Sequence, residues 1–530
     1  MTDTLAVSVA GLDDELVAAL VGERVASRIA AGDASVWGPA AQEEAAVRLG
    51  WVHLYETSRP LLAEIEALVA DLRADGLDRV VLCGMGGSSL APEVITRTAG
   101  VELTVLDTTD PAAIRRAVGD RLDRTVVVVS SKSGSTVETD SQRRAFEAAF
   151  RAAAIEPGPR LVAVTDEGSV LAEHAVESGF RRVFLADQTV GGRYSALTAF
   201  GLVPSALAGV DVSALLDEAA AAAPSLLSDD AANPALLLGA ALAGGVAQGR
   251  DKVAIADAGS GILGFAEWAE QLVAESTGKE GKGLLPVALS GVDDPEIRWP
   301  AGDVLPVVVG STHVGTDVGV AVRGPLGAQF LLWEYATAVA GRVIGINPFD
   351  QPDVESAKLA ARGLLDARPE SEPATFVDGV VEGRGTPGLL DGVDTVAGAV
   401  SALFDRLDEH GYVAVMAYLD RQGDDAALAG VRRPIASRTE RPVTFGWGPR
   451  FLHSTGQYHK GGPATGVYLQ VTGETLDDVP VPDRPFTFGE LIAAQAAGDA
   501  QVLAGHGRPV LRLHLTDRKA GVAQLLEALR

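Results

Sequence analysis

Two short loops in the first half of the chain carry residue types that could bind a phosphate group. They are GMGGSSL at 84–90 and SSKSGST at 130–136, and each follows an apolar β-branched run and opens a helical pattern. Glycines let the backbone approach an anion, and a helix N-terminus offers N–H groups and a positive dipole end. The pair predicts a clamp for one phosphate, with these contacts: Gly87, Ser88, Ser131, Lys132, Ser133 and Thr136.

Other interpretations of these loops stay open at this point. Serine and threonine cap helices without any ligand, and a glycine turn can also lack one. The first loop could be a dinucleotide fingerprint with Asp107 as the ribose ligand, although Ser89 stands where that fingerprint has its third glycine. The single cysteine, Cys83, is expected to be a packed residue at the end of a strand.

Two charged residues in apolar surroundings could do acid–base chemistry. Glu275 ends an apolar-faced helical stretch, and Gln271 lies one turn earlier on the same face. Arg193 follows two glycines in the charge-free context GGRYSALTAFGL. Spacing alone leaves structural explanations open, because a glutamate can end a solvated helix and an isolated arginine can pair with a structural carboxylate.

The elements that must position these residues alternate between strands and helices. From Arg79, five β-branched runs that end near Asp187 are separated by helical stretches, which predicts βαβ units around a parallel sheet. A second region of this kind contains the runs KVAIADAG, LLPVAL, VLPVVVG and VGVAVRG. Doubly wound sheets bind ligands beyond the carboxyl ends of their strands, where both loops fall.

Both ends of the chain are expected to carry further elements. Before position 77, apolar residues recur at intervals of three and four positions, which predicts helices. Residues 368–394 are rich in proline, glycine and acidic residues, which is typical of a linker. The remainder predicts a βαββαβ order, typical of a ferredoxin-like α+β domain. The predicted parts are a helical segment at 1–76, α/β domains at 77–210 and 211–366, and an extension at 395–530.

Composition excludes several classes of partner and location. The 530 residues include 44 Lys and Arg against 71 Asp and Glu, a net charge of −27, which repels nucleic acid and anionic membranes. One cysteine permits no intrachain disulfide, and the first residues lack the basic and apolar pattern of a secretory signal. The charge-free stretch at 231–249 contains proline and four glycines, which favours a buried helix over a membrane span. We expect a cytoplasmic protein without nucleic-acid or membrane partners.

Five motifs in order resemble those of one enzyme family. The two loops are similar to the paired loops of sugar isomerase (SIS) domains. GGRYSALTAFGL at 191–202, QLVAESTGK at 271–279 and INPFDQPDVESAK at 346–358 resemble further signatures of the glucose-6-phosphate isomerase family. The tail with FLHSTGQYHKGGP is similar to the isomerase half of bacterial transaldolase and phosphoglucose isomerase fusions. The resemblance implies two doubly wound SIS domains, metal-independent exchange of glucose 6-phosphate and fructose 6-phosphate through an enediolate, no cofactor and a homodimer.

The resemblance also assigns roles to the charged residues. Such a reaction needs one base, a cation near the developing oxyanion and a group that opens the sugar ring. By resemblance, Glu275 carries the proton between C1 and C2, Gln271 contacts the substrate and Arg193 faces the enediolate oxygen. Lys358 contacts the ring oxygen, and Gln351, seven residues earlier, is a further substrate contact.

The ring-opening histidine is predicted in the tail. The family carries it between the glutamate and lysine motifs, often from a neighbouring subunit, and this interval here contains His313. His453 and His459 lie in a glycine-rich polar loop of the kind that lines sites, and its Gly-Gln-Tyr-His order resembles a displaced Gly-Gln-His stretch of the family. We therefore predict His453 or His459, with His313 as the alternative. A zinc site at the two tail histidines would lack an evident third ligand.

Rival functions and a specificity question complete the predictions. A sugar-phosphate-binding regulatory module would need no Glu275 or Arg193, and a dinucleotide-dependent oxidoreductase is disfavoured by Ser89 and by the second hydroxyl loop. Pro352 and Asp353 depart from the pattern of many family members, so mannose 6-phosphate stays open as a second substrate.

Overall fold

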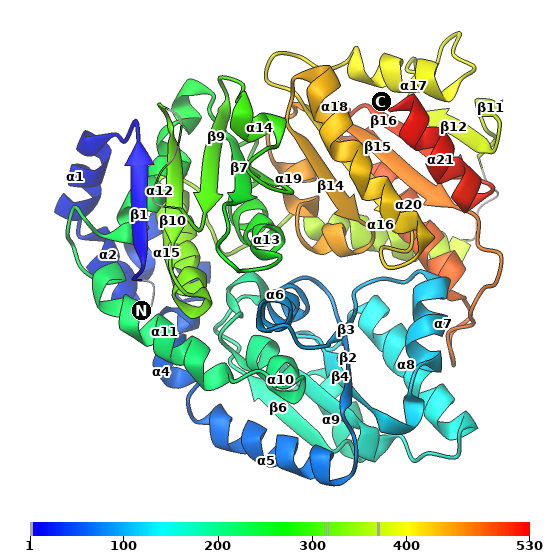
Figure 1. Cartoon of the computed structure of the whole chain (residues 1–530), viewed down its shortest axis with the longest axis horizontal. Coiled ribbons are helices and arrows are strands. Elements are labelled where there is room, and N and C mark those ends of the chain that lie inside the picture. The colour runs from blue at the N-terminus through cyan, green and yellow to red at the C-terminus, as the bar shows by residue number, and fades with distance from the viewer. Residues whose placement is uncertain (1–3, 312, 314, 316, 368–371, 530) are drawn as a thin grey trace.

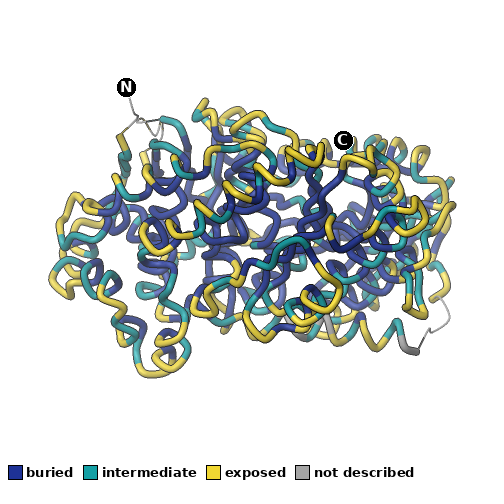
Figure 2. The backbone as a smooth tube through the Cα atoms, turned by 90° about the horizontal axis from the view of Figure 1, so that it is seen from below, coloured by how far each residue is buried: buried dark blue, intermediate teal, exposed yellow. Residues whose placement is uncertain are grey.

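Apolar strands form three sheets, and each sheet is buried on both faces. In the computed structural model, which describes residues 4–311, 313, 315, 317–367 and 372–529, the sheets occupy separate parts of the molecule (Figure 1). Figure 2 shows the buried backbone running through the interior and the exposed backbone at the rim. The predicted α/β class with mostly parallel sheets is confirmed.

The first sheet is entirely parallel, in the order β3-β2-β4-β5-β6. Alternate residues enter different cores: Val126 and Val128 join one cluster, whereas Val127 and Val129 join another. A continuous apolar run is therefore what this two-sided sheet requires. Its strands are β2 (Arg79–Gly84), β3 (Thr104–Leu106), β4 (Thr125–Ser130), β5 (Leu161–Asp166) and β6 (Arg182–Ala186). Its helices are α6 (Leu90–Ala99), α7 (Pro111–Gly119), α8 (Val137–Ala152), α9 (Val170–Glu177) and α10 (Ala199–Leu207).

The second sheet repeats this winding order and adds one antiparallel edge strand. Its order is β1-β10-β9-β7-β8, with β1 antiparallel to β10. The strands are β1 (Ala6–Ala10), β7 (Lys252–Asp257), β8 (Leu285–Ala288), β9 (Val304–Val309) and β10 (Gly319–Arg323). The helices are α11 (Val212–Leu226), α12 (Pro234–Gly244), α13 (Phe265–Thr277), α14 (Pro295–Arg298) and α15 (Leu326–Ile344). The prediction of a purely helical first segment is wrong for β1.

Beyond β1, the first segment is helical. Its helices are α1 (Asp14–Gly22), α2 (Val25–Ala30), α3 (Gln42–Ala45), α4 (Leu54–Thr57) and α5 (Leu61–Ala74). Among the described residues, none of the helices combines the length and the apolar character needed to cross a bilayer.

The third sheet corrects the ferredoxin-like prediction. Its order is β11-β12-β16-β15-β13-β14, and β13, β14, β15 and β16 are parallel, whereas a ferredoxin-like sheet is antiparallel. The short helix α19 lies between β14 and β15, so their connection is a crossover. The strands are β11 (Phe376–Asp378), β12 (Val381–Gly385), β13 (Tyr412–Tyr418), β14 (Val443–Trp447), β15 (Gly466–Gly473) and β16 (Val510–Leu515).

Strands β11 and β12 lie inside the predicted linker, so the third sheet begins before residue 395. The other predicted domain boundaries stay a proposal. The helices of this part are α16 (Val354–Ala367), α17 (Val396–Phe404), α18 (Arg432–Thr439), α19 (Gly456–Gly461), α20 (Phe488–Gly505) and α21 (Arg518–Ala528).

Buried ion pairs join the third sheet to the first. Arg450 donates to Asp107 at 2.7 Å and also pairs with Glu93, and Arg421 contacts the same two carboxylates at 3.1 and 2.8 Å. Asp107 is fully buried, and the other three side chains are at most 15% exposed. Removing one partner of such a group leaves a buried charge uncompensated, so these contacts fix how the two sheets meet.

Candidate active site

The two hydroxyl loops start side by side at the carboxyl edge of the first sheet. β2 and β4 are parallel neighbours, and Gly84 lies opposite Ser130 where both strands end. The chain winds away in opposite directions from this pair, which makes it the switch point where doubly wound sheets bind ligands. The hydroxyl oxygens of Ser131 and Thr136 are 3.0 Å apart, as are those of Ser133 and Ser135.

Gly86 and Gly87 allow three motifs to meet. A Cβ atom on Gly87 would lie 2.0 Å from the carbonyl oxygen of Gly192, directly before Arg193. Gly86 has φ +55°, and its Cβ would lie 2.7 Å from the carbonyl oxygen of His453 and 2.8 Å from Gln271 Nε2. The first loop therefore packs against the arginine turn, the glutamate helix and the tail, and only glycine fits at these two positions.

Lys132 is engaged beside the loop that it belongs to. Its Nζ donates to Asp166 Oδ2 at 2.7 Å, at the end of β5, and approaches the carbonyl oxygen of Gln188 at 3.4 Å. The charge of Lys132 is thus already paired, whereas Ser131 and Thr136, two other predicted phosphate contacts, have their hydroxyls against each other.

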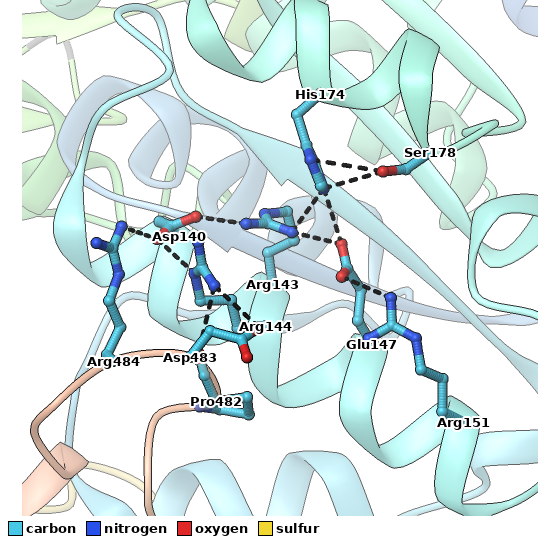
Figure 3. A network of polar contacts seen from close by, with 10 residues as sticks. All are labelled: Asp140, Arg143, Arg144, Glu147, Arg151, His174, Ser178, Pro482, Asp483 and Arg484. Carbon is cyan, nitrogen blue, oxygen red and sulfur yellow. Dashed lines mark hydrogen bonds and ion pairs between the residues drawn. The ribbon is translucent and has the colours of Figure 1, made fainter.

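A polar network holds helix α8, which follows the second loop (Figure 3). Asp140 accepts hydrogen bonds from Arg143, Arg144 and Arg484 at 2.6–2.8 Å, and Arg144 reaches the carbonyl oxygen of Pro482 at 3.3 Å. Burial opposes ionisation, but the three arginines outweigh it and hold the pKa of Asp140 below its usual value. Residues 482–484 from the C-terminal part therefore clamp α8 and, through it, the hydroxyl loop.

Glu275 and Gln271 project from one face of α13, as their spacing predicts. Glu275 is 6% exposed, and its Oε2 lies 3.4 Å from Gln271 Nε2 and 3.6 Å from Arg193 Nη1. Gln271 Nε2 also donates to the carbonyl oxygen of His453 at 2.7 Å. The glutamate is thus a buried carboxylate between an amide and a guanidinium.

Arg193 is held rigidly by oxygen atoms. Its Nε donates to Ser276 Oγ, its Nη1 to Gln351 Oε1, and its Nη2 to the carbonyl oxygens of Pro348 and Asp350, all at 2.8–2.9 Å. A guanidinium has five N–H donors, and these four bonds with described residues leave one, on the Nη1 atom that faces Glu275. One donor beside the carboxylate suits an oxyanion that forms there.

Lys279 was not singled out from the sequence, although it lies in the glutamate motif. Its Nζ donates to the carbonyl oxygens of Asn347 and Asp350 and to Asp350 Oδ1 at 2.6–2.7 Å. Burial, followed by the charge of Arg193, lowers the pKa of Lys279 to about 8. It holds the segment that carries Gln351 against the glutamate helix.

The tail reaches the site through His453. Its Nε2 lies 3.1 Å from Glu138 Oε1, in the first turn of α8, and its side chain is 16% exposed. Both residues belong to the same chain, 315 positions apart. Spacing offered no signal for this partner, although Glu138 directly follows the second loop.

The structure does not place the other two histidines at the site. His459 is 2% exposed, and its Nδ1 contacts the Tyr412 hydroxyl at 3.0 Å. Burial, with the charges of Lys460 and Arg508, lowers its pKa to about 3, so the ring is neutral and structural. Of the two predicted alternatives, His453 or His459, the structure brings His453 beside the hydroxyl loops, and His453 is therefore the residue that we carry into the proposed function. His313 is exposed, and its backbone contacts Ser311.

The lysine motif leads into α16. Gln457 ties this helix to the glutamate helix, because its Nε2 donates to Gly278 O and to Asp353 Oδ2 while its Oε1 accepts from Asp353 N. Lys358 lies in α16, and its side chain lies outside the described residues. α16 packs closely against α20, since a Cβ on Gly498 would lie 2.7 Å from Ala361 N.

Fold and site together define an α/β protein with two hydroxyl-bearing loops at one edge of a parallel sheet and a buried carboxylate beside a guanidinium. The family model for phosphoglucose isomerase matches residues 71–282. The glucose-6-phosphate isomerase of Rippkaea orientalis is 36% identical over 357 residues, which cover 56% of this chain and 68% of that protein. A probable glucose-6-phosphate isomerase of Natronomonas pharaonis is 30% identical over 355 residues, 57% of this chain and 83% of its own. The chain belongs to the phosphoglucose isomerase family.

Two further comparisons concern extent and fold. The match to the glucose-6-phosphate isomerase of Synechococcus elongatus, at 30% identity, spans 54% of this chain and 66% of that relative's length. A hypothetical protein of Thermus thermophilus has a TM-score of 0.56 at 24% identity, covering 68% of this chain and 99% of its own. A glucose-6-phosphate isomerase of Chlamydia trachomatis has a TM-score of 0.56 at 19% identity, and the match covers 69% of this chain and 89% of that protein. The two structural likenesses show a shared fold.

Proposed function

We propose that this chain interconverts glucose 6-phosphate and fructose 6-phosphate through an enediolate. The observation that carries the proposal is the buried approach of Glu275 to Arg193, 3.6 Å apart, beside two hydroxyl loops at one switch point. Family membership supports it, because the relatives that are 30% and 36% identical to this chain over 355 and 357 aligned residues are named for this activity.

Substrate binding and ring opening form the first stage. The hydroxyls of both loops and the helix N-termini behind them hold the phosphate. His453, with Glu138 beside it, moves the C1 hydroxyl proton to the ring oxygen, and the bond between C1 and that oxygen breaks to give the aldehyde. Lys358 is proposed as the ring-oxygen contact on the resemblance alone.

Proton transfer between the carbons is the second stage. Glu275 takes the C2 proton, and the electron pair moves through a new C1–C2 double bond onto O1, which becomes an oxyanion. The remaining Nη1 donor of Arg193 stabilises this charge. Protonated Glu275 then returns its proton to C1, while the proton on O2 moves to O1, and the ketose results.

The test is turnover of fructose 6-phosphate by the purified full chain, with glucose 6-phosphate detected by a coupled dehydrogenase. Turnover that disappears in Glu275→Gln supports the proposal. Binding of fructose 6-phosphate without turnover would favour a regulatory module, and reduction of NAD with the sugar phosphate would favour an oxidoreductase. Mannose 6-phosphate in the same assay answers the specificity question.

Two further expectations stay predictions. A homodimer rests on the resemblance alone, and gel filtration with light scattering would test it. The cytoplasmic location is a prediction from the composition, and fractionation of the source cells would test it.

A further inference from the structure

Gln495, on α20, contacts the carboxylate that faces His453. Its Nε2 donates a 2.7 Å hydrogen bond to Glu138 Oε1, the same oxygen that lies 3.1 Å from His453 Nε2. Its Oε1 accepts a 2.8 Å hydrogen bond from the hydroxyl of Thr109, in the loop between β3 and α7. Thr109, Glu138 and Gln495 are at most 5% exposed, so water does not compete for these contacts.

The chemistry of the groups fixes the direction of this chain of bonds. An ionised carboxylate only accepts hydrogen bonds, so the NH₂ end of Gln495 must face Glu138. The carbonyl end then faces Thr109, whose hydroxyl is the donor. Thr109 therefore orients the amide, and the amide holds Glu138 Oε1 in the position that faces His453.

The segment that carries His453 is anchored independently of Gln495. Arg450, three residues before the histidine, pairs with Glu93 and Asp107 of the first sheet, and Gln271 binds the carbonyl oxygen of His453 itself. Loss of the Gln495 amide therefore leaves these anchors of the backbone in place and removes one hydrogen bond to the Glu138 carboxylate. The contribution of Gln495 to chemistry is separable from a contribution to folding.

We infer that Gln495 is a positioning residue for ring opening, which acts on His453 through Glu138 and is itself oriented by Thr109. The inference rests on the proposed function. It assigns Gln495 to the step on the cyclic sugar and not to the proton transfer by Glu275, because its side-chain hydrogen bonds lead to Glu138 and to Thr109. A hydrogen-bonded outer partner of this kind sets the orientation of the group that reacts.

The experiment compares a cyclic and an open-chain substrate in the full chain. Fructose 6-phosphate closes to a furanose, whereas 5-deoxyfructose 6-phosphate lacks the C5 hydroxyl and stays open. Gln495→Met keeps the length of the side chain and removes the amide. We expect kcat on fructose 6-phosphate to fall about tenfold to a hundredfold, the scale of a lost hydrogen bond to a charged group, with kcat on the open-chain analogue unchanged. Gln501→Met, at an exposed position of the same helix, is the matched control.

A second comparison asks whether Gln495 acts through His453. In the His453→Ala background, adding Gln495→Met should lower turnover of fructose 6-phosphate no further. Equal losses on both substrates, or a further loss in that background, would overturn the inference. A wild-type chain inactive on both substrates would instead mean that the proposed function fails.

Should Gln495→Met not fold, the hydroxyl that orients the amide provides the test. Thr109→Val removes the hydroxyl at nearly constant shape, and Thr109→Ser retains it. We expect the valine variant to lose activity on the cyclic sugar only, and the serine variant to restore it. Equal activity of Thr109→Val and Thr109→Ser on fructose 6-phosphate would overturn the inference.

Discussion

Replacing Glu275 by glutamine removes the proposed base while keeping the size of the side chain. Its Oε2 lies 3.4 Å from Gln271 and 3.6 Å from Arg193, both longer than a normal hydrogen bond. The amide therefore fits the same space, and neither of these two contacts is a short bond that the substitution would break. Catalysis is the property that should change most.

The expected effect of the substitution on kcat can be separated from its effect on the free energy of unfolding. Loss of a general base lowers kcat by roughly 10²-fold to 10⁴-fold. Breaking a buried ion pair can cost about 3–5 kcal/mol of stability, but Arg193 keeps four short bonds to protein oxygens, so we expect a smaller loss in the free energy of unfolding. The variant should remain folded at assay temperature.

Two measurements report the result. The coupled assay gives kcat, and NMR follows exchange of the C1 hydrogen of fructose 6-phosphate in deuterium oxide, which reports proton abstraction by itself. Glu267→Gln, at an exposed position of the same helix, is the control. A Glu275→Gln chain that turns over within a few-fold of wild type and still exchanges this hydrogen would refute the assignment.

Four other outcomes follow from the structure. Arg193→Lys should lower kcat/KM by roughly 10²-fold to 10³-fold, the scale of one oxyanion donor; equal kcat/KM would make the arginine purely structural. Ser131→Ala should weaken competitive inhibition by inorganic phosphate by about 1.5–3 kcal/mol, and an unchanged inhibition constant would remove it from the clamp. His459→Phe should keep wild-type kcat. The pKa of His459 is lowered to about 3 in the folded protein, whereas the unfolded ring protonates near pH 6.5. The wild-type protein therefore loses up to ~1.4 kcal/mol of its free energy of unfolding for each pH unit below 6.5. Denaturant titrations should show a smaller loss in His459→Phe. The pH dependence has the opposite sign for Glu270, because burial, and then the charge of Glu267, raise its pKa to about 8. The wild-type protein is therefore destabilised as the pH rises from 4.5 to 8. Glu270→Gln should be more stable than wild type at pH 7.5, and denaturant titrations should show that this difference disappears near pH 4.5.

Local patterns predicted the parts of the site that lie within one motif. Gly87, Ser131 and Glu275 each follow a strand or share a helix face with their neighbours, so spacing along the chain placed them. Contacts between segments that are distant in the sequence cannot be predicted from local spacing. The approach of His453 to Glu138 spans 315 positions, and nothing in either local sequence selects the other residue.

The errors in the predicted fold have the same physical origin. AVSVA at 6–10 is a five-residue edge strand that gains its structure by pairing with β10. The connection between β14 and β15 contains only a 3₁₀ turn and a six-residue helix, too short for an amphipathic period to be visible. The local sequence around His459 is typical of a polar loop. It contains no sign of the burial of this ring, which comes from Tyr412 of β13, 47 positions away.

A site assembled from a single chain has a genetic consequence. Where subunits exchange catalytic groups, two different inactive alleles can rescue each other, because a mixed dimer contains one intact site. In this protein Glu275, Arg193, Glu138 and His453 all come from one polypeptide. Under the proposed function, we therefore expect an allele that lacks Glu275 and an allele that lacks His453 to remain inactive when they are expressed together.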